Sequence, residues 1–274
     1  MIVTESAGRY RFVTQPAHAA LSGRFARHWG GSIPAPDARH ATVVAAETHD
    51  QGWSDYDCRP RLADGDPVGF VDADGEDWVE FYERGVDVAE AIDPYAGLLV
   101  SMHAAGLRRG GYGVRDAILD LSDRPPFAAF VDAQETRQDE LAARLVDAGR
   151  LDEADIDLLA DLHADGTAPM GALRRPLWRD YLLLQALDSL SLYACNSARF
   201  EDATVGPVPA GDDDTVSISL SPVGPATLRL DPYPFDVPAL SVSIPRRVVP
   251  TDADDIVTAY YDADVRRTEV SFVG

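Results

Sequence analysis

Residues 47–53 read Glu47-Thr48-His49-Asp50-Gln51-Gly52-Trp53, and the apolar run Ala41–Glu47 precedes them. A histidine and an aspartate therefore stand side by side where the pattern predicts the end of a helix. Gly52 can adopt a positive φ, so we expect it to stop the helix as its C′ residue. Because a single His-Asp pair is common by chance, its meaning depends on which other polar residues share a buried surface with it.

The composition describes a globular chain of unusual charge. The 274 residues are 46% hydrophobic, enough for one large domain or a domain with an appended lobe. There are 46 acidic residues against 24 basic ones, a net charge of −22, and every base is arginine because the chain has no lysine. A GC-rich genome explains arginine in place of lysine but not the excess of acids. Molar salt screens such a surface, so we expect a halophilic, cytoplasmic source and neither nucleic acid nor anionic membranes as partners.

Several kinds of chemistry are excluded by residues that the chain lacks. Without lysine there is no pyridoxal Schiff base, phosphate-loop lysine or kinase-type ATP lysine. Cys58 and Cys195 stand alone, so no thiolate zinc site or disulfide framework is expected. The N-terminus has no secretory pattern and no apolar run reaches about 18 residues, which predicts a soluble chain.

The periodicity of apolar residues divides the chain into a helical part and a β part. It predicts helices over Ala17–Trp29, Asp37–Gln51, Glu76–Ile92, Tyr95–Leu107, Phe127–Ala148, Asp152–Ala164 and Leu177–Cys195. It predicts strands over Ile2–Thr4, Arg9–Thr14, Thr215–Leu220, Thr227–Leu230, Leu240–Val249, Ile256–Tyr261 and Arg266–Phe272. We therefore expect an α+β protein, mainly a helical bundle (15–200) with an antiparallel β lobe (205–274) that residues 1–14 complete. The loop 55–75 is a candidate lid.

Polar residues interrupt the apolar faces of four predicted helices: His18, His49 with Asp50, His103, and Asp188. Imidazoles and carboxylates that converge from several helices can hold a divalent cation without thiolates. Taken singly, each has a simpler explanation, since a buried histidine is usually a hydrogen-bonded core residue and Asp188 could pair with an arginine. His40 and His163 lie in more polar surroundings and are not expected to be ligands.

The order of these residues resembles that of the HD superfamily of metal-dependent phosphohydrolases. More narrowly, the chain is similar to the uncharacterised domain-of-unknown-function family 3891. The matching segments are Gln15-Pro16-Ala17-His18, His49-Asp50-Gln51-Gly52-Trp53, Asp93-Pro94-Tyr95, Ser101-Met102-His103 and Asp188-Ser189-Leu190-Ser191-Leu192. The resemblance implies an HD-like helical domain with His18, His49, Asp50 and Asp188 as metal ligands, and His103 as a ligand of a second metal or a phosphate contact.

The resemblance also implies a reaction. Histidine and carboxylate ligands suit one or two Mn, Fe, Co, Ni or Zn ions, and such a site hydrolyses a small phosphorylated metabolite or nucleotide. Asp50 and His103 would take part in catalysis. HD enzymes often offer a lysine to the phosphate, and here Arg108 and Arg109 are the nearest substitutes, with Arg59 and Arg61 as others. Two alternatives stay open: a di-iron oxygenase and a non-catalytic HD-like scaffold. A homo-oligomer is compatible with either.

Overall fold

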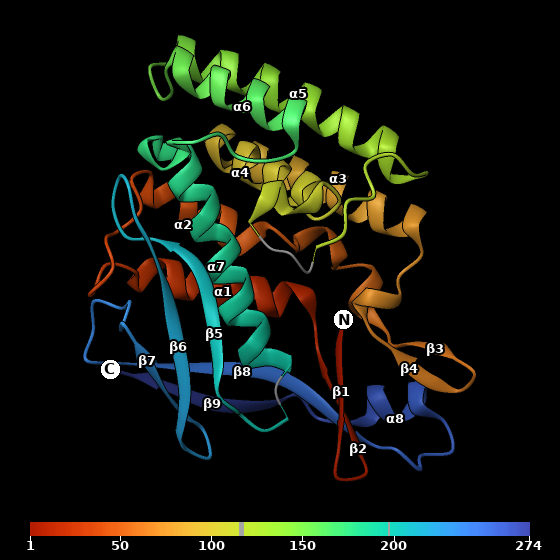
Figure 1. The fold of residues 1–274 in the computed structure, drawn as a ribbon. Helices are drawn as coiled ribbons and strands as arrows, with labels where there is room; N and C mark the ends of the chain where they lie inside the picture. The colour runs from red at the N-terminus through yellow and green to blue at the C-terminus, as the bar shows by residue number, and fades with distance from the viewer. Residues whose placement is uncertain (115–117, 197) are drawn as a thin grey trace.

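The structure is a computed structural model that describes residues 1–114, 118–196 and 198–274. A layer of helices lies on a curved sheet, with the helical pair α5–α6 farthest from the sheet (Figure 1). The main helices are α1 (Gln15–His28), α2 (Arg39–Thr48), α3 (Gly75–Ile92), α4 (Pro94–Gly106), α5 (Phe127–Asp147), α6 (Glu153–Asp165) and α7 (Pro176–Asn196). A short helix, α8 (Ile256–Asp262), lies at the edge of the sheet near β2 and β8.

Seven strands form one sheet in the order β1-β2-β8-β9-β7-β6-β5. Their bounds are β1 (Ile2–Ser6), β2 (Arg9–Val13), β5 (Ala203–Pro209), β6 (Thr215–Gly224), β7 (Thr227–Asp231), β8 (Ala239–Pro250) and β9 (Arg266–Val273). Neighbouring strands are antiparallel except β7 and β9, which are parallel. The N-terminal hairpin enters the sheet through β8, where Arg11 lies opposite Val248. The first and last segments of the chain therefore share one sheet.

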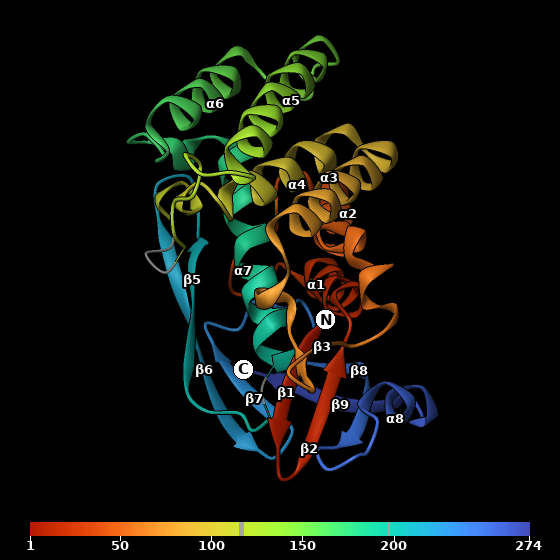
Figure 2. The ribbon, with the colours of Figure 1, turned by 90° about the vertical axis from the view of Figure 1, so that its right-hand side faces the viewer.

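Helices α1 and α7 join the helical layer to the sheet (Figure 2). Helix α1 begins where the Thr14 side chain accepts a hydrogen bond from the Ala17 amide, with Pro16 in the first turn. Helix α4 begins in the same way, with Asp93 accepting from the Tyr95 and Ala96 amides. One connected hydrophobic core contains Leu99 of α4 and Phe272 of β9. The helical layer and the sheet are thus packed directly against each other.

The predicted fold class is wrong in its proportions. The protein is not a mainly helical HD bundle with a small lobe, because the seven-stranded curved sheet is a principal layer of the molecule. The sheet is also not purely antiparallel. The sequence pattern predicts no strand at the position of β5. This strand contains Gly206 and Pro207, residues that weaken the alternating pattern of a strand. Which strands pair is decided by contacts between distant residues, and periodicity does not report these.

Three local predictions also change. Residues predicted as the strand Ile256–Tyr261 form α8, because the Asp255 side chain accepts from the Val257 and Thr258 amides and caps a helix. Helix α2 ends at Thr48, and Gly52 has no positive φ. A Cβ at Gly52 would lie 1.8 Å from the Phe81 carbonyl oxygen, so glycine is needed there for close packing.

The loop 55–75 carries a small hairpin of β3 (Arg61–Ala63) and β4 (Asp66–Val68). Two short 3₁₀ turns flank this hairpin, at Tyr56–Cys58 and Phe70–Asp72. In the described part of the chain, none of the helices has the length and apolar character that a membrane crossing needs.

Candidate metal centre

Four of the predicted ligands meet at one buried point. His18 comes from α1, His49 and Asp50 follow the last turn of α2, and Asp188 comes from α7. These three helices pack against one another, which brings residues 170 positions apart into contact. All four residues are at most 4% exposed. The apolar faces of the helices therefore carry their polar residues to a common interior site, as the sequence pattern predicted.

The donor atoms lie at the separations expected around a single ion. His18 Nε2 is 3.2 Å from His49 Nε2 and 3.1 Å from Asp188 Oδ1. His49 Nε2 is 3.5 Å from Asp188 Oδ1, and Asp50 Oδ2 is 3.6 Å from both imidazole nitrogens. Ligands about 2.1 Å from one cation lie roughly 3.0–3.4 Å apart in octahedral or tetrahedral geometry. The two shortest separations fall within this range, and the other three exceed it by 0.1–0.2 Å.

Neighbouring groups determine which nitrogen of each imidazole faces the cluster. The Ser191 hydroxyl donates to the Asp188 carbonyl at 3.0 Å, so it accepts from His18 Nδ1–H at 2.9 Å. His49 Nδ1–H donates to the Ala46 carbonyl at 2.9 Å. Each imidazole therefore directs its Nε2 atom inward. Two unprotonated Nε2 atoms 3.2 Å apart would repel each other, so the cluster needs positive charge between them and the carboxylates, either as a metal ion or as a proton on Nε2.

The charge balance at the site also calls for a cation. Asp50 Oδ1 is buried and has no hydrogen-bond partner in the described part of the chain. Burial alone would lower the pKa of His49, but the carboxylates of Asp50 and Asp188 outweigh burial and raise it to about 9. Burial would raise the pKa of Asp188, whereas hydrogen bonds with His18 and His49 hold it well below its usual range. The site thus favours positive charge among anionic oxygens.

His103 lies beside this cluster on α4. Its ring centre is 5.1 Å from that of His49, and His103 with His49 and Asp50 forms a second group with ligand atoms within 4.8 Å of one another. His103 Nδ1 lies 2.9 Å from the Gln185 side-chain amide. If the amide oxygen faces the ring, Nδ1 carries the proton and His103 Nε2 carries the lone pair that a metal ion would bind. If the amide nitrogen faces it, Nε2 carries a proton that it can donate.

The residues fit a divalent transition metal. Two neutral imidazole nitrogens and two carboxylate oxygens form a donor set typical of Mn²⁺, Fe²⁺, Co²⁺, Ni²⁺ or Zn²⁺. His18, His49, Asp50 and Asp188 would hold the ion, and the orphaned Asp50 Oδ1 would remain for a bound water or a second ion. The Ser191 hydroxyl and the Ala46 carbonyl orient the imidazoles of His18 and His49 toward this point.

The two adjacent arginines predicted to contact a phosphate have different surroundings. The Arg108 guanidinium lies 3.8 Å from the Trp78 ring centre. Its positive charge acts to lower the pKa of Tyr82. Arg109 instead forms an ion pair with Glu135 at 3.2 Å and donates to the Ser122 hydroxyl. Arg108 therefore lies near Tyr82 and the candidate centre, whereas Arg109 contacts α5 and the loop before it.

Two further residues near the centre were missed by the sequence analysis. Tyr82 of α3 is buried, and its pKa is raised well above normal by burial and by the charges of Asp50 and Asp188. Asp57 is buried and accepts from the Met1 amino group and from the Gln15 amide at 2.5 Å. Tyr82 lies within the predicted helix Glu76–Ile92, and Asp57 lies within the loop 55–75. Neither position carries a pattern that separates it from its neighbours.

Ser191 could have been found from its position. It follows Asp188 by three residues on the same helix, a spacing that places both side chains on one face. A hydroxyl in a buried stripe beside a carboxylate needs a partner, and His18 is that partner. The signal is weak because Ser189 and Ser191 both occur in this segment.

Comparison with known proteins gives a family but no function. No curated protein and no solved structure matches the chain. A family model described as "Protein of unknown function (DUF3891)" matches residues 1–251, which include every ligand of the candidate centre. The chain therefore belongs to the protein family of unknown function DUF3891.

Proposed function

We propose that this protein is a metal-dependent hydrolase of a small phosphoester, with its ion held by His18, His49, Asp50 and Asp188. The supporting observation is the approach of two imidazole Nε2 atoms to 3.2 Å beside two carboxylate oxygens. This ligand order resembles that of HD phosphohydrolases, although the overall fold differs from an HD bundle. The centre also has no thiolate, so a structural zinc site of the usual kind is not favoured.

The chain's own groups suit such a reaction. A bound divalent ion would lower the pKa of a water and polarise a phosphoryl oxygen. Asp50 Oδ1, buried and without a partner among the described residues, is placed to accept a proton from that water. Arg108 offers positive charge near the centre for the phosphoryl oxygens, in place of the lysine that this chain lacks. Aromatic rings of Trp78 and Phe127 hold its guanidinium from two sides.

The second group of ligand atoms supports one alternative. His49 and Asp50 belong to that group together with His103, which would allow two ions to share ligands. If both ions are iron, activation of O₂ becomes the rival reaction, and a visible absorption band would identify it. A non-catalytic scaffold is less favoured, because it would bury two imidazoles and two carboxylates at one point without a ligand.

Elemental analysis of protein purified without chelator is the first test. The proposal expects about one or two transition-metal equivalents, lost in His49→Ala and in Asp188→Ala. His28→Ala is the matched control, since His28 lies on α1 but pairs with Asp236 at 3.1 Å, away from the centre. Metal-loaded protein should then hydrolyse p-nitrophenyl phosphate or bis(p-nitrophenyl) phosphate. Wild-type protein that binds no metal when supplied with these ions contradicts the proposal.

A further inference from the structure

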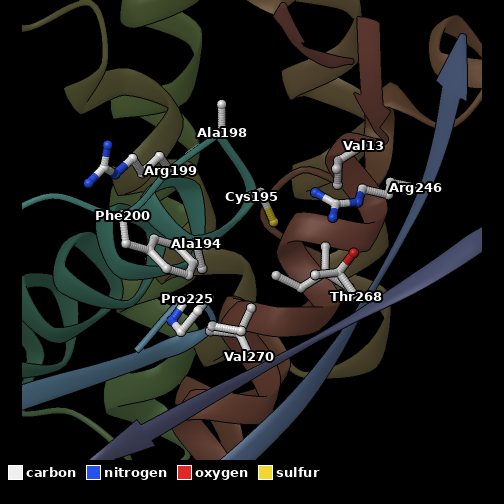
Figure 3. A pocket seen from close by; sticks show the side chains of 12 residues that line it. Val13, Ala194, Cys195, Ala198, Arg199, Phe200, Pro225, Arg246, Thr268 and Val270 are labelled. Carbon is white, nitrogen blue, oxygen red and sulfur yellow. The ribbon is translucent and has the colours of Figure 1, made fainter. Parts of the chain in front are cut away.

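A second site lies about two turns along α7 from Asp188, where the C-terminal end of this helix meets the sheet. A cavity of about 80 Å³ opens between Ala194 and Cys195 of α7 and the strands β8 and β9. Arg246, Thr268 and Cys195 point into it from different elements (Figure 3). Val13, Ile244 and Val270 line the cavity with apolar surface. None of these residues belongs to the candidate metal centre.

The register of the sheet gathers arginines on this face. Arg246 of β8 lies directly opposite Arg266 of β9, and Thr268 lies opposite Ile244 two residues along. Arg11 of β2 is opposite Val248, so its side chain leaves the sheet on the same face as Arg246. Paired residues in an antiparallel ladder share a face, and like charges placed opposite each other are destabilising. The arrangement therefore concentrates positive charge at one edge of the cavity.

This positive charge is not neutralised within the described part of the chain. Arg246 has neither a carboxylate partner nor a hydrogen bond there, and Arg11 contacts only the Ala198 carbonyl, at 3.4 Å. Burial lowers the pKa of Arg246, and the charge of Arg11 lowers it further. Burial raises the pKa of Cys195 to about 12, so this thiol is neutral and does not balance the guanidinium.

Some other partly buried arginines of this chain do have carboxylate partners. Arg137 binds Asp87 and Glu90, and Arg175 binds Asp152 and Asp155. A partly buried guanidinium without a carboxylate is costly, and Arg246 is in this situation beside the cavity. A bound anion would supply the negative charge that the described part of the chain does not provide beside Arg246.

We propose that this cavity binds a small organic anion, whose carboxylate or phosphate group contacts Arg246 and the Thr268 hydroxyl. A guanidinium presents a planar pair of N–H donors that suits either anion, and a hydroxyl adds a third donor. A short apolar body would lie on Val13, Ile244 and Val270. The volume admits a group of a few heavy atoms, comparable to a few water molecules, and excludes a nucleotide.

Calorimetric titration with inorganic phosphate and with butyrate, at constant ionic strength, tests this site. We expect one butyrate or phosphate per chain, with affinity reduced at least tenfold in Arg246→Gln and less in Arg246→Lys. Arg229→Gln is the matched control, because this substitution removes the same charge from an exposed position on β7. Comparing the two probes shows which anionic group the site prefers. Thermal melts of each variant establish that the fold is retained.

Three results would overturn the site. One is the absence of binding of both probes up to about 10 mM, beyond the range of useful affinity. Another is equal weakening by Arg246→Gln and Arg229→Gln, which would mean attraction by general charge. The third is binding that Arg246→Gln leaves intact but Asp188→Ala abolishes, which would assign the anion to the metal centre.

Discussion

Replacing Ser191 with alanine removes the hydroxyl that accepts a hydrogen bond from His18 Nδ1 at 2.9 Å. No metal ligand is deleted, yet His18 loses the group that keeps its proton on Nδ1 and its lone pair on Nε2. Losing such an orienting partner lowers metal affinity about 10- to 100-fold, equivalent to about 1.4–2.8 kcal/mol. Without metal, the buried Nδ1–H that is left unpaired costs about 1–3 kcal/mol of folding stability.

The assay is competition for Zn²⁺ or Mn²⁺ against a chromophoric chelator, together with thermal melts with and without the metal. Ser189→Ala is the matched control. Ser189 lies two residues away on the same helix, and its hydroxyl donates to the Gln185 carbonyl at 2.8 Å without touching a histidine. We expect Ser191→Ala to bind metal more weakly and to gain less stability from it, and Ser189→Ala to resemble the wild type. Unchanged affinity in Ser191→Ala, or equal losses in both variants, refutes the reasoning about the tautomer.

Three further predictions concern other parts of the molecule. Burial raises the pKa of Asp180 to about 6 despite the hydrogen bond from Tyr95, so the folded protein binds more protons than the unfolded one between about pH 4 and 6. Stability should therefore fall by about 2–3 kcal/mol as pH rises through this window, and urea titrations of Asp180→Asn should show a flatter profile. Gly52→Ala should lower the free energy of unfolding by about 3 kcal/mol, because the new Cβ would meet the Phe81 carbonyl. Gly149→Ala, whose Cβ would meet nothing within 4 Å, should lower it by about 1–2 kcal/mol because of the positive φ at this position. Denaturant unfolding curves measure both changes. Under the proposed function, Arg108→Gln should reduce phosphoester hydrolysis at least tenfold with little change in bound metal, while Arg109→Gln should mainly lower the melting temperature.

The burial of the candidate ligands could be predicted because local rules determine which helical faces are buried. Helical spacing places His18 and Asp188 on apolar faces, and a polar group on such a face must find a partner or a ligand. The end of α2 at Thr48, just before His49 and Asp50, follows the end of an apolar run. These signals need only the few residues on either side. The same applies to the seven main helices, whose positions the pattern predicted.

What the pattern did not predict depends on contacts between distant residues. The sheet joins the hairpin of β1 and β2 to β8, where Arg11 pairs with Val248, and β7 runs parallel to β9. Strands that are distant in sequence find these partners only in the folded chain. Arg108 and Arg109 are neighbours in sequence, but the packing of α3 and α5 sends one to Trp78 and the other to Glu135. The cluster of Arg11, Arg246 and Arg266 exists only through strand register. Local periodicity determines which face of an element is buried, whereas tertiary packing alone determines which buried faces meet.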